Sequence, residues 1–188
     1  MALVAVYDAC VLHDPMLRDL LVRLAMRRQL NLRARWSERI LEEMVRSIQR
    51  RRPDLDVDRL ARTRTLMTEA IPDCLVTGYE HLVESLELPD PDDRHVLAAA
   101  IRAHAQVIVT FNLADFPAAQ LQIHELEAVH PDDFVLGLID LNEVSVVASF
   151  SEQIASLRSP PVSVSTALDA LRTKGLPRTA DALDTLLQ

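Results

Sequence analysis

The sequence predicts an α/β fold in which helices cover a central parallel sheet, followed by an all-helical C-terminal extension. Short apolar runs without polar alternation, which are typical of strands buried on both faces, alternate with amphipathic helical patterns. From Pro131 onward only helical patterns remain. The 188 residues suffice for one domain with an appendage. We therefore expect an α/β domain over residues 1–135 and a helical extension over residues 136–188.

The strands and helices of this domain are expected to alternate along the chain. The run ALVAVY at residues 2–7 predicts a buried first strand that ends at Asp8. Three amphipathic helices follow, at residues 14–29, 37–52 and 56–70. Later apolar runs predict three further strands, at residues 74–77, 106–110 and 122–129. In the extension, RSPPVS at residues 158–163 predicts a hinge before a helical hairpin that turns at Gly175 and Pro177.

The composition argues against several functional classes. Only three glycines occur in the chain, so no glycine-rich nucleotide-binding loop can be built. Cys10 and Cys74 have neither CxxC spacing nor a partner cluster, which indicates buried thiols rather than a zinc site or a disulfide framework. The longest apolar runs are too short to cross a bilayer, and no basic region precedes an apolar one at the N-terminus. We expect a cytoplasmic protein with no membrane partner.

Two acids stand out in the first third of the chain. Asp8 ends a buried strand, and ligand sites in open parallel sheets lie beyond the carboxyl ends of strands. Taken alone, Asp8 is equally compatible with a turn or a helix cap. In the helix over residues 37–52, rotation by about 100° per residue places Glu42 opposite the apolar face and Glu43 at its edge. Glu43 is therefore the better site candidate, and Glu42 is expected on the surface.

The stretch LPDPDDRHVLAAAI at residues 88–101 places three aspartates directly before a helical pattern. Asp90, followed by Pro91, is typical of a helix N-cap and needs no further role. Asp93 shares the apolar stripe of the helix, where a carboxylate is costly unless it is paired or binds a metal. Asp92 is the reserve candidate.

A fourth group follows the predicted strand in VIVTFNLADF, residues 107–116, where Thr110, Asn112 and Asp115 fall at the carboxyl end. Asn and Asp are also common turn residues, so this stretch alone decides little. Together, however, the four candidate acids fall at one predicted sheet edge, and clustered carboxylates are stable chiefly when a cation neutralises them. Oxygen ligands without Cys or paired His favour Mg²⁺ or Mn²⁺, whose usual chemistry here is phosphate-ester hydrolysis.

These stretches together resemble the PIN-domain ribonucleases, in particular the VapC-type toxins of bacterial toxin–antitoxin pairs. The resemblance rests on VAVYDACVL, WSERILEEM, DPDDRHVLAAAI and VIVTFNLADFP, whose order and spacing cover about residues 3–135. It implies an α/β/α sandwich, a Mg²⁺- or Mn²⁺-dependent endoribonuclease, a homodimer and a cognate antitoxin. The helical region after Pro131 resembles an extension of longer relatives.

The same resemblance assigns roles to individual residues. The catalytic and metal-binding acids are Asp8, Glu43, Asp93 and Asp115, with Thr110 as a supporting hydroxyl. Asn112 stands where many relatives have another Asp, which leaves the ligand set open.

The uneven charge of the chain suggests how RNA would approach such acids. Residues 1–64 hold fourteen of the twenty basic residues against nine of the twenty-eight acids, which gives +5 there and −13 in the rest. Arginines on amphipathic helices often only solvate the outer face, but cations at the rim of an acidic site would contact RNA phosphates. The candidates are Arg46, Arg50, Arg51 and Arg52. Whereas RNA would contact the arginines, an antitoxin would contact the acids, placing an Arg or Lys between the carboxylates.

Three alternatives remain at this level. A nucleophilic pair of Cys10 and His95 lacks a third, orienting member. A haloacid-dehalogenase-like phosphatase also has an Asp after the first strand, but it needs a second Asp two residues later, where this chain has Cys10. A non-catalytic PIN-fold binding module is possible in principle, although the complete set of acids argues against it.

Overall fold

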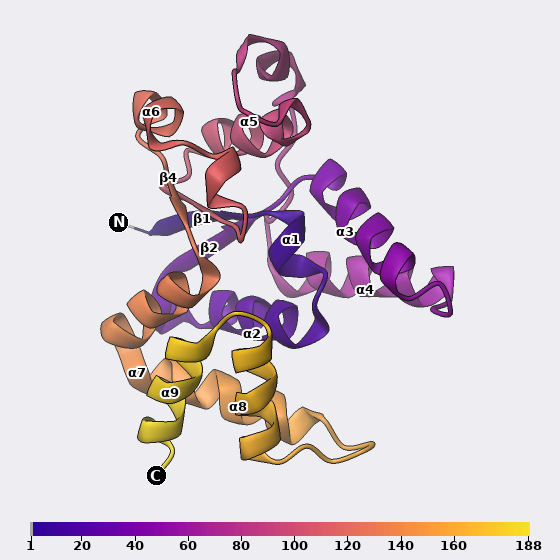
Figure 1. Ribbon diagram of the computed structural model, residues 1–188, viewed down its shortest axis with the longest axis vertical. Helices are drawn as coiled ribbons and strands as arrows, with labels where there is room; N and C mark the ends of the chain where they lie inside the picture. Colours follow the sequence, from indigo (N-terminus) through magenta and orange to yellow (C-terminus); the bar gives the residue numbers. More distant parts are fainter. Residues whose placement is uncertain (1) are drawn as a thin grey trace.

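The computed structural model describes residues 2–188 and confirms the α/β fold with a helical C-terminal extension (Figure 1). Four parallel strands form the sheet in the order β2-β1-β3-β4. Their bounds are β1 Leu3–Tyr7, β2 Leu32–Arg35, β3 Val107–Val109 and β4 Glu127–Val129. In this order β1 and β3 are the central strands, so their carboxyl ends lie side by side.

Helices lie on both sides of the sheet (Figure 1). Helix α5 packs against β1 and β3, whereas α2 packs against β2 and is itself covered by α7. The helices up to the last strand are α1 Ala9–Leu12, α2 Pro15–Met26, α3 Glu38–Arg51, α4 Val57–Ala70, α5 Arg94–Arg102 and α6 Ala118–Leu121. The extension consists of α7 Pro131–Ser156, α8 Val164–Thr173 and α9 Pro177–Leu186. Short 3-10 turns complete the chain at Arg28–Leu30, Glu80–Ser85, Pro91–Asp93, Leu113–Asp115 and Gln122–His124.

One predicted strand is wrong, and one strand of the sheet was not predicted. Residues 74–77 form no strand, because Leu75 makes only an isolated bridge to Trp36 and the chain turns at Gly78, whose φ is +71°. The sequence also did not indicate β2. Its two apolar residues are buried while Arg33 is exposed, as suits a strand at the edge of the sheet, and the alternating LRAR therefore lacks a continuous apolar run.

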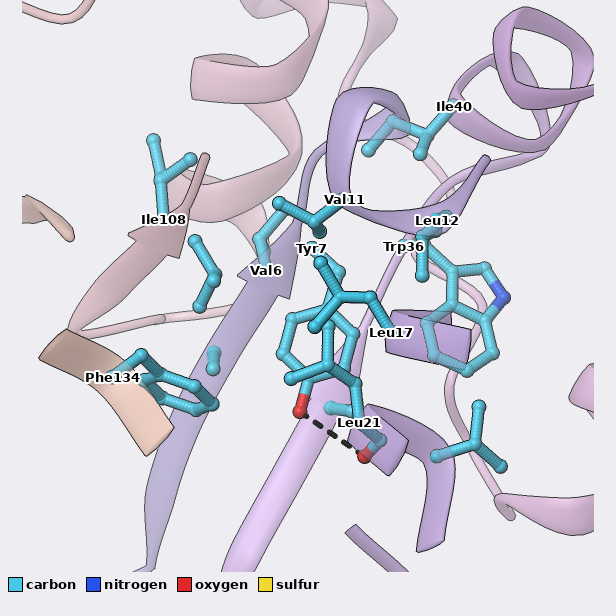
Figure 2. Packing of buried hydrophobic residues seen from close by; sticks show 14 of the residues in the cluster. Val6, Tyr7, Val11, Leu12, Leu17, Leu21, Trp36, Ile40, Ile108 and Phe134 are labelled. Atoms are coloured by element: carbon cyan, nitrogen blue, oxygen red, sulfur yellow. Dashed lines mark hydrogen bonds between the residues drawn. The ribbon is translucent and has the colours of Figure 1, made fainter. Parts of the chain in front are cut away.

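Aromatic side chains connect the sheet of the α/β domain to the first helix of the C-terminal extension. Tyr7, the last residue of β1, stacks on Trp36 with ring centroids 6.3 Å apart and meets Phe134 edge-on at 6.0 Å. Figure 2 shows Tyr7 among Leu17, Leu21 and Phe134. Because Phe134 belongs to α7, the first helix of the extension covers the core of the α/β domain, and a boundary after residue 135 falls inside that helix.

Helix α7 differs from the expectation that no segment would reach membrane-spanning length. Its 26 residues have a mean hydropathy of 1.5 in the most apolar window, enough for a span by length and composition alone. Asn142 is non-helical, however, and divides α7 into two shorter pieces. Apolar residues from both pieces, including Phe134, Leu138 and Phe150, are buried against the rest of the protein, and this packing accounts for the hydropathy of the helix.

Candidate functional site

The carboxyl ends of β1 and β3 open into a cavity of about 860 Å³, which we call the acidic pocket. Its polar lining includes two kinds of side chain. The oxygen-bearing residues are Asp8, Glu43, Ser47, Gln49, Asp92, Asp93 and Asn112, and the basic residues are His13, Arg46, Arg50 and Arg51. Side chains from widely separated parts of the chain therefore meet at the predicted edge of the sheet.

Asp8 is fixed at the base of this pocket by contacts across the two central strands. It directly follows β1, is 4% exposed, and its backbone N–H donates to the carbonyl of Val109 in β3 at 3.1 Å. The buried Thr110 hydroxyl donates to Asp8 Oδ2 at 2.7 Å. The same hydroxyl accepts from the N–H of Asn112 at 3.0 Å, which orders the loop after β3. Thr110 therefore holds the Asp8 carboxylate in one orientation.

Cys10 is a second donor to the same carboxylate. Its thiol lies 3.1 Å from Asp8 Oδ2 and 3.3 Å from the Thr110 hydroxyl, and it accepts from the N–H of Phe111 at 3.2 Å. Burial, followed by the charge of Asp8, raises the pKa of Cys10 to about 12. The thiol is protonated at neutral pH, which removes the basis for a cysteine nucleophile.

Glu43 enters the pocket from α3 and is surrounded by cations. The helical-face analysis is confirmed, because Glu42 is exposed whereas Glu43 is half-buried and lines the pocket. Arg39 and Arg46 lie 3.6 Å and 3.7 Å from Glu43 Oε1. The buried His95 places Nε2 2.9 Å from the same oxygen, without the geometry of a hydrogen bond. His95 thus packs beneath Glu43 and limits the positions that the carboxylate can take.

Unlike Glu43, Asp93 has no basic side chain among the described residues paired with its carboxylate. As predicted, Asp90 caps the turn that precedes α5, with its carboxylate accepting from the N–H of Asp92 at 2.9 Å. Asp93 itself is half-buried, and no hydrogen bond or ion pair to its carboxylate occurs within residues 2–188. Burial first, and then the charges of Asp8, Asp90, Asp115 and Glu43, together raise the pKa of Asp93 to about 7.

Some of the remaining candidates line the acidic pocket and others lie outside it. Asn112 and Asp92 are exposed and line the pocket. Asp115 does not line it, but its charge acts on Asp93, so it lies nearby in the turn Leu113–Asp115. Arg46, Arg50 and Arg51 line the pocket, whereas Arg52 does not and instead makes two hydrogen bonds to Asp54, at 2.7 Å and 2.8 Å.

The donor set fits a hard divalent cation. It consists of carboxylate, hydroxyl and amide oxygens, and Asp93 is a half-buried carboxylate whose pKa is raised by burial and by the neighbouring acids, so a cation beside it would stabilise its charged form. Within residues 2–188, no three His, Cys, Asp or Glu side chains are already arranged to hold a metal. An open arrangement of this kind suits Mg²⁺, which keeps several waters and takes few carboxylate ligands.

Sequence reasoning missed His13 and misjudged the roles of Cys10 and His95. It considered Cys10 and His95 only as a nucleophilic pair, but the Cys10 thiol donates to Asp8 and lies beside Thr110. His95 instead lies beneath Glu43. His13 shows no signal in the sequence, because its role depends on Arg51, whose Nη1 lies 2.6 Å from His13 Nε2.

Comparison with known proteins agrees with this geometry. The profile of the PIN domain family matches residues 4–114, more than half of the chain. The chain belongs to the PIN domain family. The profile described as the VapC50 C-terminal domain matches residues 131–185, which correspond to α7, α8 and α9 of this PIN domain protein.

A curated relative and the solved structures complete the comparison. The protein named "Putative ribonuclease VapC50" from Mycobacterium tuberculosis (strain ATCC 25618 / H37Rv) is 42% identical over 94 residues. That alignment covers 50% of this PIN domain protein and 55% of the relative, so it spans about half of each chain. No solved structure gives a significant match.

Proposed function

We propose that this PIN domain protein is a Mg²⁺- or Mn²⁺-dependent endoribonuclease that hydrolyses RNA phosphodiester bonds. One observation carries the proposal: Asp8, Glu43 and Asp93 line one pocket at the carboxyl ends of β1 and β3, and Asp115 lies close enough for its charge to act on Asp93. Such a cluster is stable chiefly with a cation. The PIN family profile and a relative whose printed name includes ribonuclease support the same chemistry.

The residues of the pocket divide the work of such a reaction. Asp8, Asp93, Asp115 and Glu43 would hold the cation, with Asn112 as a further oxygen donor. When bound, the cation supplies Lewis acidity to activate water and to stabilise charge on the leaving oxygen. Thr110 and Cys10 hold Asp8 in place, and His95 limits the movement of Glu43. Arg46, Arg50 and Arg51 draw the phosphate backbone toward these acids.

The biological setting we infer is that of a type II toxin–antitoxin pair. Toxins of this kind are held inactive by a cognate antitoxin, which here would place an Arg or Lys among the carboxylates of the acidic pocket. We further propose that the protein works in the cytoplasm as a homodimer. The name of the M. tuberculosis relative and the matching C-terminal profile support this setting.

The test is cleavage of RNA by the purified full chain, free of antitoxin. A fluorescent single-stranded RNA and a structured RNA are incubated with Mg²⁺ or Mn²⁺, with EDTA, and with EDTA followed by excess Mg²⁺. We expect cleavage with either metal, none in EDTA, and recovery after Mg²⁺ is restored. Cleavage that persists in EDTA would reject metal dependence. Binding without cleavage under all conditions would favour the non-catalytic binding module.

No observation favours the phosphatase alternative. Its chemistry needs a second Asp two residues after the first, and Cys10 occupies that position with a protonated thiol that donates to Asp8.

A further inference from the structure

A second cavity, of about 520 Å³, adjoins the acidic pocket and shares His13 and Arg51 with it. We call it the basic cavity, because its charged lining is almost entirely cationic. The cations are Arg18, Arg51, Arg52, Arg59 and Lys174, and Asp14 is the only acid among the lining residues. Three separate parts of the chain build this cavity: the turn between α1 and α2, the adjoining ends of α3 and α4, and the turn between α8 and α9.

Much of this positive charge has no acidic partner. Arg52 is bound to Asp54, and Lys174 Nζ lies 3.0 Å from Asp14 Oδ2. Within residues 2–188, Arg18, Arg51 and Arg59 make no ion pair with a carboxylate; Arg18 donates instead to the carbonyl of Leu12 at 2.8 Å. Cations gathered in a concave site concentrate positive potential and attract anions.

His13 lies between the two cavities, and the cations around it affect its pKa. The pKa of His13 is lowered first by burial and then by the charges of Arg51 and Lys174, with Asp14 opposing them. A neutral His13 can accept from the guanidinium of Arg51, 2.6 Å away, and this contact keeps Arg51 at the wall that both cavities share.

Lys174 is the contribution of the C-terminal extension, and it is the only lysine in the chain. The tight turn after α8 brings it to the cavity, and this turn needs Gly175 for two reasons. Gly175 has a φ of +88°, and a Cβ there would lie 3.3 Å from the ring of Phe111 in the loop after β3. The turn is therefore held against the loop that carries Thr110 and Asn112, at a fixed place beside both cavities.

We propose that the basic cavity binds a backbone phosphate of the RNA, adjacent to the phosphate that is cleaved, and that Lys174 and Arg59 are among its ligands. This inference rests on the proposed function, because it takes the acidic pocket as the cleavage site. His13 and Arg51 line both cavities, so the two cavities adjoin and a strand that leaves the acidic pocket at these residues would reach the basic cavity next. The role of the extension is then to complete the substrate path of the α/β domain.

The first test measures RNA binding separately from cleavage. The full chain is titrated into a fluorescent single-stranded RNA with Ca²⁺ in place of Mg²⁺, a gel verifies that the RNA stays intact, and anisotropy gives Kd at several salt concentrations. Lys174→Gln and Arg59→Gln are compared with Arg62→Gln, a matched control. Arg62 is exposed on the same helix as Arg59 but does not line the basic cavity.

The expected effects follow from the loss of phosphate contacts. Each of Lys174→Gln and Arg59→Gln should weaken binding by roughly 3- to 10-fold at low salt and reduce the slope of log K against log salt by about 0.7. The double variant should reduce the slope by about 1.4. Arg62→Gln should leave both quantities close to those of the wild type. Cavity variants that behave like Arg62→Gln would overturn the inference.

The second test uses the single lysine of the wild-type chain and does not depend on how any variant folds. An amine-reactive reagent is applied with and without intact RNA in the Ca²⁺ buffer, and the modification of Lys174 is quantified by peptide mass spectrometry. RNA should slow the modification at least several-fold. Unchanged modification at saturating RNA would overturn the inference even if the enzyme cleaves RNA with Mg²⁺. Protection by polyglutamate but not by RNA would also overturn it, since the cavity would then suit an acidic protein segment.

The two proposals can fail separately. Loss of the cleavage activity with intact protection of Lys174 would refute the nuclease and leave an RNA-binding cavity. Cleavage of RNA without protection of Lys174 would support the nuclease and refute RNA binding in the basic cavity.

Discussion

The acidic pocket and the basic cavity share two residues, His13 and Arg51, but they are built from different parts of the fold. The acids of the pocket are placed by the sheet, whose central strands end side by side, and by the helices that begin or pass near that edge. The cations of the cavity are placed by helices and turns around the sheet, including one turn of the C-terminal extension. Under the proposed function, the sheet would set the reaction chemistry and the surrounding helices would set how the substrate is held.

Asp8→Asn should give the largest effect, because it removes charge from the position that the sheet fixes most firmly. We expect cleavage to fall by about 1000-fold, the scale seen when a key electrostatic group is lost from an active site. The melting temperature should stay the same or rise, since repulsion within the pocket decreases. The measurements are kcat/KM on a fluorogenic RNA and thermal unfolding. An activity loss below tenfold would show that the sheet edge does not set the chemistry.

Glu43→Gln and Glu42→Gln form the next comparison, between adjacent residues on one helix. Glu43 lines the pocket and Glu42 is exposed. We expect Glu43→Gln to lower cleavage by about 100-fold, within the range for a positioned acid–base group, and Glu42→Gln to change it less than twofold. The reverse ranking would contradict the placement of α3 at this site.

The arginines at the rim of the acidic pocket should act on binding more than on chemistry. Neutralising Arg46, Arg50 and Arg51 together should reduce the salt slope of RNA binding by about 2, if each contacts one phosphate of a single strand. At saturating RNA, turnover should change little, because these side chains hold the substrate. Arg28→Gln combined with Arg62→Gln and Arg158→Gln removes the same charge from exposed positions outside both cavities and serves as the control. An equal effect in the control would mean that net charge alone draws RNA to the protein.

The smallest expected effect is on stability, and it comes from Asp93; Asp93→Asn should also lower cleavage strongly, because Asp93 is one of the residues proposed to hold the cation. In the folded protein, burial and the neighbouring acids raise the pKa of Asp93 to about 7, above its usual value of 3.8. Between these values the folded state keeps a proton that the unfolded state releases, so stability falls as pH rises from about 4 to 7. Asp93→Asn removes this loss and should be more stable than the wild type at pH 8, by about 1–2 kcal/mol after allowance for solvent screening, but not at pH 4.

This prediction is checked by urea unfolding in EDTA at pH 4 and pH 8. Mg²⁺ should stabilise the wild type at pH 8 more than it stabilises the variant. Identical pH dependence in the two proteins would show that the carboxylates around Asp93 do not interact in the way the pocket suggests.

The sequence predicted the parts of the site that depend on local periodicity. Asp8 is found at a strand end, Glu43 at the edge of a helical face and Asp90 at a cap, because each placement follows from a few neighbouring residues. The contacts of His95 with Glu43, and of Lys174 with Asp14, join residues far apart in the chain. Such pairs depend on how whole elements pack. The edge strand β2 was not predicted for the same reason, because its place in the sheet depends on its pairing with β1.

The hydrogen bond from Thr110 to Asp8 joins residues 102 positions apart, and this has a consequence for folding. Non-local contacts form late and slowly, because a long loop must close before they contribute. A nascent or partly degraded chain that lacks the strand before Thr110 therefore has Asp8 but no site. For a protein that would destroy RNA in the cell that makes it, harmful activity would begin only when the chain has folded across its full sheet.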